Sequence, residues 1–397
     1  MSDFHQHGLI STLQRLSDSN AEIIESELAV LAQEKPISLV LPCHFGDLGV
    51  PLERILDKLS GASFLSEIIV SVNGGDEDGF RAAKKILTAC TLPVRVLWND
   101  SPAFEAVHAL LSDVTQSPPV RGKGLNVWAA IGLVVAEGKS ELIVTQDCDV
   151  ASFRRETFSR LCYAGLRPGL GFDFSKMYYS RVTDRIYGRV SRLFLAPLLQ
   201  ALVRVVGHHP LLDFLLSFRY PLAGECALRR ELAAAVSLRA DWGLEIGMLC
   251  EVFRAIEPAR VCQVDGGGNY DHRHHPLETE SGGGLGNMSA QIARALFDHI
   301  GGEGVRMDEG FAAAVQLSWR REAQEALRRY ESLALMNSIP FDSAGEQQAV
   351  DVFSGALERA SSQHAAPKAI LPSWKRIASQ APDFVARFRE AVAAENA

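Results

Sequence analysis

The seven residues "VTQDCDV", 144–150, close an apolar run at 141–145 that has the pattern of a buried strand. Asp147 and Asp149 follow that run one residue apart. If the chain is still extended there, both carboxylates leave it on the same side, because the side chains of a strand alternate. Two like charges held this close are costly unless a cation offsets them. An isolated Asp-x-Asp is more often a solvated loop, so the neighbouring sequence decides its meaning.

Upstream of this run, the chain alternates between short apolar runs and helical patterns. Strands are predicted at 37–45, 67–75 and 93–100, and helices at 51–59, 78–90, 104–114 and 122–138. Because a helix separates each strand from the next, the strands are joined by crossovers in a mostly parallel sheet. Ligands bind such sheets beyond the carboxyl ends of the strands, where this sequence has "PCHFGD", "NGGDEDG", "WNDSP" and "QDCD".

The alternation weakens beyond residue 150, and apolar helical patterns dominate the rest of the chain. One more short strand is expected just before "GGGNYDHRHHPLE" (266–278), and nearly everything after residue 289 has a helical pattern. The expected organisation is a helical segment at 1–35, a ligand-binding α/β domain at 36–285 and a helical C-terminal region at 286–397.

Composition argues against two classes of function. The 397 residues include 40 basic and 48 acidic side chains, and the formal net charge of −8 disfavours a nucleic-acid partner. Seven cysteines are scattered without a Cys-x-x-Cys pair, which favours reduced thiols in a cytoplasmic protein. The most apolar stretch, 193–218, is interrupted by Pro197 and Pro210 and predicts buried helices rather than a transmembrane segment.

The acidic pair would become favourable if it held a metal. Mg²⁺ and Mn²⁺ take oxygen ligands, usually one or two carboxylates together with phosphate oxygens. A metal held by Asp149 on a diphosphate would stabilise a departing nucleotide, which is what an enzyme acting on nucleotide sugars needs. A later histidine could complete the ligand shell, and "DHRHHPLE" offers His272, Arg273 and His274. An exposed polar loop explains such a cluster about as well.

A second element is "RGKGLNVWAAIGLVV" (121–135), in which Gly122, Lys123 and Gly124 open a long apolar helix. Backbone N–H groups and a cation converge at such a helix start, where a phosphate or a uracil carbonyl could bind. The spacing is not that of a P-loop. Alone, a Gly-Lys-Gly turn is usually nothing more than the start of a helix.

Four further motifs follow along the chain, namely "GRVSRLFLAPLL" (188–199), "PLAGECALRREL" (221–232), "WGLEIGML" (242–249) and "HRHHPL" (272–277). In this order, the motifs together resemble a known family. The resemblance is to the glucosyl-3-phosphoglycerate synthases and the related mannosyl-3-phosphoglycerate synthases, which are retaining nucleotide-sugar transferases. It covers roughly residues 36–277. It implies an α/β fold of the A-type glycosyltransferase class, with a Rossmann-like, mostly parallel sheet flanked by helices and followed here by a helical C-terminal extension.

The resemblance also implies roles on the donor side. Asp149 and His272 would hold Mg²⁺ or Mn²⁺ on the nucleotide diphosphate, and Asp147 would contact the ribose or the donor sugar. Lys123 would contact the base, and Gly122 would also bind the nucleotide. Further nucleotide-binding positions at the ends of the first two strands are Pro42, His44, Asp47 and Asn73. Of these, Asp47 stands in for a ribose-binding glutamate that "PCHFGD" lacks, and Asn73 replaces a serine near the uracil.

On the acceptor side the match is less even. The residues implied to bind the acceptor are Gly188, Arg189, Val190, Ser191, Tyr270, Arg273 and His274. Tyr270 and His274 replace the arginine and asparagine with which the family grips the acceptor phosphate, so recognition of that phosphate is expected to have moved. Glu245 would face the acceptor hydroxyl and, with Asp147 and Asp149, completes the predicted catalytic set.

Some side chains in these motifs have two interpretations. Trp128, Trp242 and residues 194–199 are expected in the core rather than against a ligand. Tyr178 and Tyr179 could line the acceptor pocket or pack beneath it.

The predicted function is transfer of glucose from UDP- or GDP-glucose to the C2 hydroxyl of 3-phosphoglycerate, with retention of the anomeric configuration. The protein is expected to be a homodimer. No side chain is placed as a covalent nucleophile, which favours a front-face displacement. Transfer to glycerate, or from GDP-mannose, is an alternative within the same class. A sugar nucleotidyltransferase is a more distant alternative, because "PCHFGDLG" lacks the basic residue such enzymes carry there. The intact "DCD" argues against an inactive scaffold.

Overall fold

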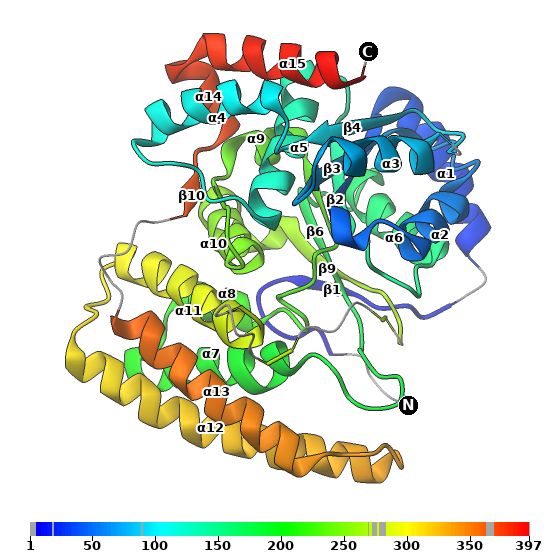
Figure 1. Ribbon diagram of the computed structural model, residues 1–397. Coiled ribbons are helices and arrows are strands. Elements are labelled where there is room, and N and C mark those ends of the chain that lie inside the picture. The colour runs from blue at the N-terminus through cyan, green and yellow to red at the C-terminus, as the bar shows by residue number, and fades with distance from the viewer. Residues whose placement is uncertain are drawn as a thin grey trace.

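The computed structural model describes residues 5–17, 20–88, 90–268, 270–271, 276–277, 283–362 and 369–396. An eight-stranded sheet crosses its centre in the order β1-β9-β6-β7-β5-β2-β3-β4 (Figure 1). These strands are β1 (Ser11–Leu13), β2 (Ile37–His44), β3 (Leu65–Asn73), β4 (Val94–Trp98), β5 (Leu142–Thr145), β6 (Phe174–Tyr178), β7 (Cys226–Arg229) and β9 (Val261–Asp265). β7 runs antiparallel to β5 and β6, and all other neighbours are parallel. The predicted α/β fold with a mostly parallel sheet is confirmed.

Helices cover both faces of this sheet (Figure 1). The α-helices are α1 (Ala21–Glu34), α2 (Val50–Leu59), α3 (Glu77–Leu87), α4 (Pro102–Thr115), α5 (Lys123–Glu137), α6 (Arg155–Leu166), α7 (Ala196–Val206), α8 (Pro210–Leu216), α9 (Arg230–Ala235), α10 (Leu244–Ala255), α11 (Leu285–Gly302), α12 (Glu309–Met336), α13 (Ser343–Ser362), α14 (Trp374–Gln380) and α15 (Pro382–Asn396). Shorter elements are the 3-10 turns η1 (Phe45–Asp47) and η3 (Pro258–Arg260) and the π-helical η2 (Val190–Leu195). Two apolar clusters fill the two sides of the sheet.

The central strand β2 sets the position of the binding edge. Its residues are buried up to Cys43, as expected of a strand that is covered on both faces. It pairs with β5 as far as Val40 opposite Thr145 and with β3 as far as His44 opposite Asn73. The strand therefore runs past Pro42 to His44, within the range 37–45 that the sequence predicted. β5 has already left the ladder there, so the missing N–H of proline does not interrupt that pairing.

The C-terminal helices pack against the rest of the molecule in two groups. Helices α11, α12 and α13 pack on η2, and α12 also packs on α7, whereas α15 returns to α4 and the sheet edge at β4 and α14 packs on α9 (Figure 1). The Trp374 ring stacks on Trp128 at 4.5 Å, and each indole N–H donates to a backbone carbonyl beside the other ring. Gly132 permits this approach, because a Cβ there would lie 1.8 Å from the Trp374 ring. The division of the chain at 285 and 286 stays a prediction.

The sequence-based assignment missed two central strands. β6 and β7 lie in the region where helical patterns dominate. A separate two-stranded sheet is formed by β8 (Leu238–Arg239) and β10 (Ile370–Leu371). β7 has four residues, and β6 carries Ser175 and Lys176 in its centre, so neither has a long apolar run. Short strands of this kind are fixed by their partners in the sheet rather than by local propensity.

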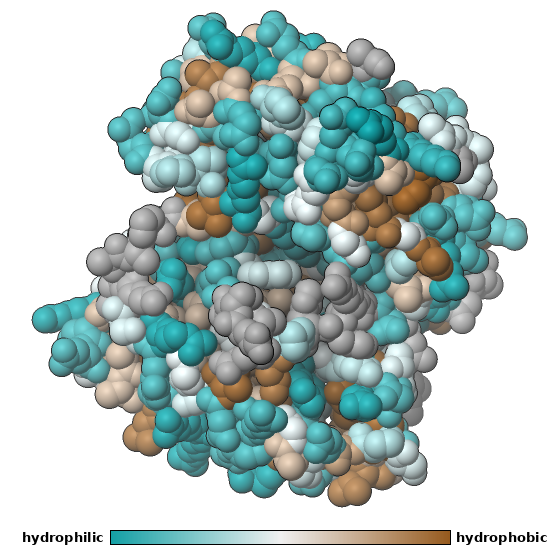
Figure 2. Space-filling view, viewed as in Figure 1, coloured by the Kyte–Doolittle hydropathy of each residue, from teal (hydrophilic) through white to brown (hydrophobic). Residues whose placement is uncertain are grey.

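Figure 2 shows a surface hollowed between an upper part, which carries α4 and α15, and the lower helices around α12. In the described part of the chain, each helix is too short or too polar to cross a bilayer.

The last turn of α15 completes the open edge of the sheet at β4. Glu395 accepts hydrogen bonds from Trp98 N (2.9 Å) and from the Ser101 hydroxyl. Asn396 accepts from Val96 N (3.0 Å) and donates to Val96 O (2.7 Å). Burial raises the pKa of Glu395 to about 7 from its ordinary 4.5. The folded state therefore holds this proton more tightly than the unfolded chain does.

This raised pKa predicts a loss of stability as pH rises from 4.5 to 7, because the folded state then gives up a proton that it binds more tightly than the unfolded chain does. The Glu395→Gln variant keeps a neutral side chain of the same shape. We expect the wild type, but not the variant, to lose about 2 kcal/mol of unfolding free energy from this site over that range. Urea denaturation at pH 5 and pH 8 measures it, and parallel pH dependence in the two proteins would contradict the assignment.

Candidate active site

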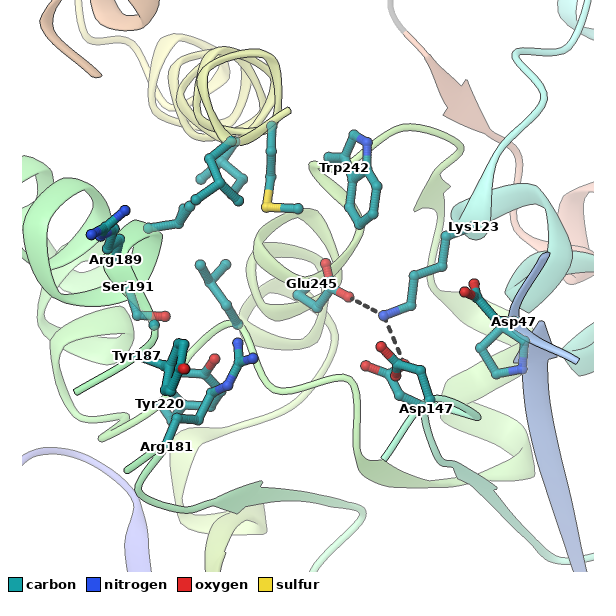
Figure 3. A pocket seen from close by; sticks show the side chains of 18 of the residues that line it. Asp47, Lys123, Asp147, Arg181, Tyr187, Arg189, Ser191, Tyr220, Trp242 and Glu245 are labelled. Atoms are coloured by element: carbon teal, nitrogen blue, oxygen red, sulfur yellow. Dashed lines mark hydrogen bonds and ion pairs between the residues drawn. The ribbon is translucent and has the colours of Figure 1, made fainter. Parts of the chain in front are cut away.

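A cavity of about 600 Å³ lies beyond the carboxyl ends of β2, β3 and β5 (Figure 3). Most of the residues singled out in the sequence line it, namely Pro42, His44, Asp47, Asn73, Gly122, Lys123, Asp147, Asp149, Gly188, Arg189, Val190, Ser191 and Glu245. The fold thus brings together segments that are up to 203 positions apart, from residue 42 to residue 245. Their roles stay predictions, but the structure places them around one space.

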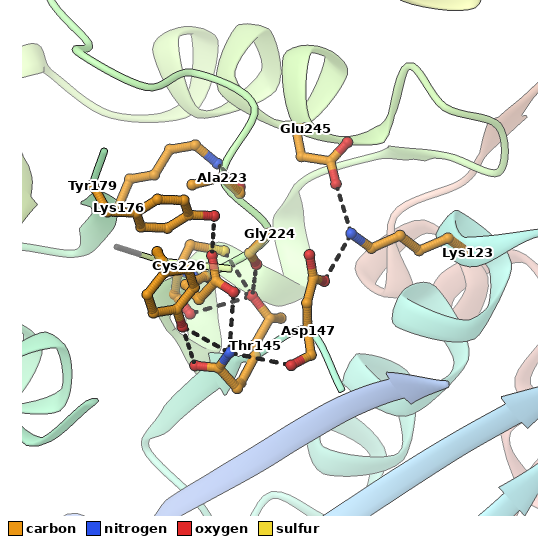
Figure 4. Close-up of polar contacts among 12 residues, drawn as sticks. Lys123, Thr145, Asp147, Lys176, Tyr179, Ala223, Gly224, Cys226 and Glu245 are labelled. Atoms are coloured by element: carbon orange, nitrogen blue, oxygen red, sulfur yellow. Dashed lines mark hydrogen bonds and ion pairs between the residues drawn. The ribbon is translucent and has the colours of Figure 1, made fainter. Parts of the chain in front are cut away.

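An ion-pair triad holds one side of this cavity together (Figure 4). The Lys123 Nζ atom lies 2.8 Å from Asp147 Oδ1 and 3.0 Å from Glu245 Oε1. Burial opposes the charge on Lys123, but the two carboxylates outweigh it and raise the pKa of Lys123 well above its ordinary value. Lys123 is therefore a fixed cation that joins the end of β5 to the first turn of α10.

Glycines make the close contacts around this triad possible. A Cβ on Gly124 would lie 1.9 Å from the Arg239 carbonyl oxygen, so the start of α5 packs directly on that backbone. A Cβ on Gly224 would lie 2.4 Å from the carboxylate oxygens of Asp147. The second glycine of "GKG" therefore has a packing reason, apart from the phosphate contact considered for the motif.

A buried polar network lies behind Asp147. The Gln146 amide donates to Glu225 Oε1 (3.0 Å) and to the Tyr270 hydroxyl (2.9 Å), and the Tyr179 hydroxyl donates to Glu225 Oε2 (2.9 Å). The rings of Tyr179 and Tyr270 stack at 4.0 Å. Burial raises the pKa of both tyrosines well above the ordinary value, which keeps them neutral donors. The network fixes the chain at the base of the Asp-x-Asp segment.

This network gives Tyr270 a different position from the one predicted. Its side chain is 3% exposed and does not belong to the cavity lining, because its hydroxyl is engaged by Gln146 and its ring by Tyr179. Tyr179 does line the cavity, whereas Tyr178 lies under the Arg219 guanidinium at 5.0 Å. Trp128 is buried as predicted, but Trp242 is 36% exposed and lines the cavity, so its assignment to the core was wrong.

The ends of β2 and β3 form the opposite wall. The Asn126 amide of α5 donates to Asn73 Oδ1 (2.8 Å), which ties the end of β3 to the helix that begins with Lys123. His44 Nδ1 accepts from Gly46 N at 3.0 Å and so shapes the turn that carries Asp47. These contacts leave both strand ends in the cavity lining.

Arginines gather on the far side, in the loop between β6 and η2 (Figure 3). Arg185 pairs with Asp184 (2.9 Å) and Arg189 with Glu346 (2.8 Å). Arg181 has no carboxylate partner among the described residues, and its buried Nε lacks a hydrogen-bond partner there. Four lining residues were not predicted from the sequence, namely Arg181, Arg185, Tyr187 and Tyr220. The signal was the recurrence of arginine at every fourth residue, 181, 185 and 189.

The predicted metal and phosphate residues His272, Arg273 and His274 lie outside the described residues. Within the described ranges, no group of three or more histidine, cysteine, aspartate or glutamate side chains could hold a metal ion. Asp149 lines the cavity and offers carboxylate oxygens. Asp271 is tied to the segment just after Asp149, because Ala151 N donates to Asp271 O (3.0 Å) and Asp271 N donates to the Ser152 hydroxyl (2.8 Å).

Comparison with known proteins places this cavity in a family. No family model matches the sequence. A glucosyl-3-phosphoglycerate synthase from Persephonella marina is 33% identical over 400 residues, covering 100% of this chain and 99% of that protein. The chain belongs to the glucosyl-3-phosphoglycerate synthase family. The resemblance inferred from the motifs is confirmed.

Solved structures of the glucosyl-3-phosphoglycerate synthase from Mycobacterium tuberculosis have the same fold. One, in complex with Mn²⁺, UDP-glucose and phosphoglyceric acid, matches with a TM-score of 0.54 and 25% identity over 74% of this chain and 87% of that chain. Another, in complex with Mg²⁺ and UDP, matches with a TM-score of 0.54, 25% identity and the same coverage. The A-type glycosyltransferase fold that the sequence resemblance implied is therefore confirmed.

Replacing Lys123 with methionine removes the charge between Asp147 and Glu245 and leaves two carboxylates facing each other. At pH 8 we expect the variant to lose about 2 kcal/mol of unfolding free energy, less than for a fully buried pair because the lysine is 24% exposed. Added salt should reduce the loss, since screening weakens the repulsion between the two carboxylates. Urea denaturation at low and at high ionic strength measures this, and an equal loss at each would show that the triad is not electrostatic.

Proposed function

We propose that this chain transfers glucose from UDP-glucose to 3-phosphoglycerate and forms glucosyl-3-phosphoglycerate. The observation that carries this proposal is the full-length match, at 33% identity, to a glucosyl-3-phosphoglycerate synthase, together with a cavity lined by the motif residues. UDP-glucose as the donor is supported by the complex of the M. tuberculosis enzyme. Release of UDP follows from this proposal, and retention of the anomeric configuration, which the resemblance implies, is proposed with it.

The residues present fit a divalent cation. Asp149 brings carboxylate oxygens to the cavity, and the hydrogen bonds of Asp271 to Ala151 and Ser152 hold the chain next to His272 close to the Asp-x-Asp segment. Asp149 and His272 would hold Mg²⁺ or Mn²⁺, both of which occur with UDP in structures of the M. tuberculosis enzyme. When bound, such an ion neutralises the charge of the leaving diphosphate.

The distribution of charge around the cavity supports two subsites. The acids Asp47, Asp147 and Asp149 follow the ends of β2 and β5, and Glu245 lies in the first turn of α10, whereas Arg181, Arg185 and Arg189 lie in the loop before η2. The donor, with its cation, is placed at the acidic side with Pro42, His44, Asn73, Gly122 and Lys123. The acceptor, with a phosphate and a carboxylate, is placed at the basic side against residues 188–191.

The chain's own groups position the reactants rather than attack them. Asp147 and Glu245 are both paired with Lys123, which fixes their side chains between the two subsites. In the proposed step the acceptor C2 oxygen bonds to the anomeric carbon as the bond to the diphosphate oxygen breaks. The hydroxyl proton passes to that leaving oxygen on the same face of the sugar. No enzyme side chain gains or loses a covalent bond to the sugar.

Two further expectations belong to this proposal. The seven cysteines are all free thiols, most of them buried, which supports action in the reducing cytoplasm. A homodimer, as expected from the sequence, is the proposed state in solution.

The test is an assay of nucleoside diphosphate release with Mg²⁺ or Mn²⁺ and a panel of UDP-glucose, GDP-glucose and GDP-mannose. Each donor is combined with 3-phosphoglycerate or with glycerate. Release that requires UDP-glucose and 3-phosphoglycerate is the expected result. Preference for glycerate or for GDP-mannose would replace the proposed substrates, and pyrophosphate release from UTP and glucose 1-phosphate in a parallel incubation would point to a nucleotidyltransferase.

Replacing Asp149 with asparagine removes a charged oxygen ligand while keeping the size of the side chain. We expect turnover to fall roughly 1,000-fold, since the cation contributes several kcal/mol to stabilising the leaving group. The melting temperature should stay within a few degrees of the wild type. Activity retained by Asp149→Asn at saturating Mn²⁺ would remove Asp149 from the metal site.

Arg181 offers a positive charge for the acceptor phosphate. Replacing it with glutamine should raise the KM for 3-phosphoglycerate roughly 10- to 100-fold, the worth of a charge-assisted hydrogen bond, and leave the KM for UDP-glucose unchanged. Glycerate, which lacks the phosphate, and glycerol 3-phosphate, which lacks the carboxylate, identify the group that Arg181 binds. An equal relative loss with glycerate and 3-phosphoglycerate would assign Arg181 to the carboxylate instead.

A further inference from the structure

We propose that Glu346 of α13 is a positioning residue for the acceptor turn, residues 188–191, and that the hairpin of α12 and α13 is thereby part of the acceptor site. The inference rests on the proposed function, because it names what holds the turn placed against the acceptor. The turn begins at Gly188, which has a φ of 77°, a backbone conformation that favours glycine. It leads directly into the wide π-helical turns of η2, a geometry often found at functional sites.

The contacts of Glu346 carry the inference. Its side chain is only 5% exposed, although it ends in a carboxylate. Along the chain, Glu346 lies far from the strands of the sheet. One oxygen accepts from Arg189 Nε at 2.8 Å, and the other pairs with a terminal nitrogen of Arg192. A buried carboxylate is stable only when such partners compensate it. Glu346 therefore ties the first helical turn of α13 to both arginines of "GRVSR".

Arg192 passes this restraint on to the rest of the loop. Its side chain is buried, and its nitrogens donate to Tyr187 O and Ile186 O, each at 3.1 Å. Its guanidinium also lies 5.1 Å from the ring centre of Tyr330 in α12. Ile186 and Tyr187 both line the cavity. The hairpin thus holds the acceptor loop through side chains, from Glu346 and Tyr330 through Arg192 to the backbone carbonyls.

The charge balance explains why a carboxylate is needed here. Arg189 and Arg192 are three positions apart and share one negative charge, so the group keeps one positive charge beside the cavity. Glu346 accepts from Nε of Arg189. Among the described residues, no hydrogen-bond partner is found for the two terminal nitrogens of Arg189. Without Glu346, the two guanidinium groups would repel each other inside the protein and displace the turn.

The test compares Glu346→Gln and Glu346→Asp with Glu322→Gln as a matched control. Glu322 of α12 pairs with Arg204 of α7 at 2.7 Å and so docks the same hairpin by an ion pair away from the turn. The expected result for Glu346→Gln is a rise of about tenfold or more in the KM for 3-phosphoglycerate. Its Kd for UDP-glucose, from calorimetry with Mn²⁺, should stay within about twofold of the wild type. Glu346→Asp should lie between, and Glu322→Gln should keep the wild-type KM.

Several outcomes would overturn the inference. Glu346→Gln and Glu322→Gln could raise the acceptor KM equally, which would make docking of the hairpin the cause. Donor binding could be lost in both Glu346 variants, which would make Glu346 a residue of the fold alone. An unchanged acceptor KM in Glu346→Gln would also refute it. Turnover of the wild type with UDP-glucose and 3-phosphoglycerate is measured first, so that failure of the proposed function itself is recognised separately.

Discussion

The contact of Lys123 with Asp147 and Glu245 is the interaction on which the site depends. It joins the first residue of α5, the end of β5 and the first turn of α10, three elements that meet only in the folded chain. A lysine between two carboxylates leaves the group negative, so the strand ends keep an excess of negative charge that a cation can offset. The short distances require the backbone to approach closely, and Gly124 and Gly224 supply that approach.

The two ends of the cavity carry side chains of opposite charge. Carboxylates gather where the parallel strands finish, and arginines gather in the loop that precedes η2. A nucleotide sugar with its cation and an acceptor with two anionic groups need opposite surroundings, and a single cavity of this kind offers both. The C-terminal helices contribute to this arrangement, because α13 contacts the arginine loop and α15 closes the sheet edge at β4.

Local patterns predicted the strand ends well, because alternation and glycine-rich turns are properties of neighbouring residues. They also placed Asp147 and Asp149 in one cavity. They could not predict the antiparallel strand β7, whose four residues are fixed by pairing on both sides. Ion pairs between distant segments were equally hidden, as with Glu245 and Lys123, 122 positions apart. Trp242 was misassigned because its ring is apolar, and apolar character alone does not distinguish a core from a cavity wall.

Electron spin-echo spectroscopy of Mn²⁺ bound together with UDP tests the cation site most directly. If the acidic strand end and the distant histidine hold one ion on the diphosphate, the wild type shows coupling of the manganese to an imidazole nitrogen. That coupling should disappear in His272→Ala and persist in His274→Ala. A wild-type spectrum without nitrogen coupling, or one that His272→Ala leaves unchanged, would contradict a cation shared between Asp149 and His272.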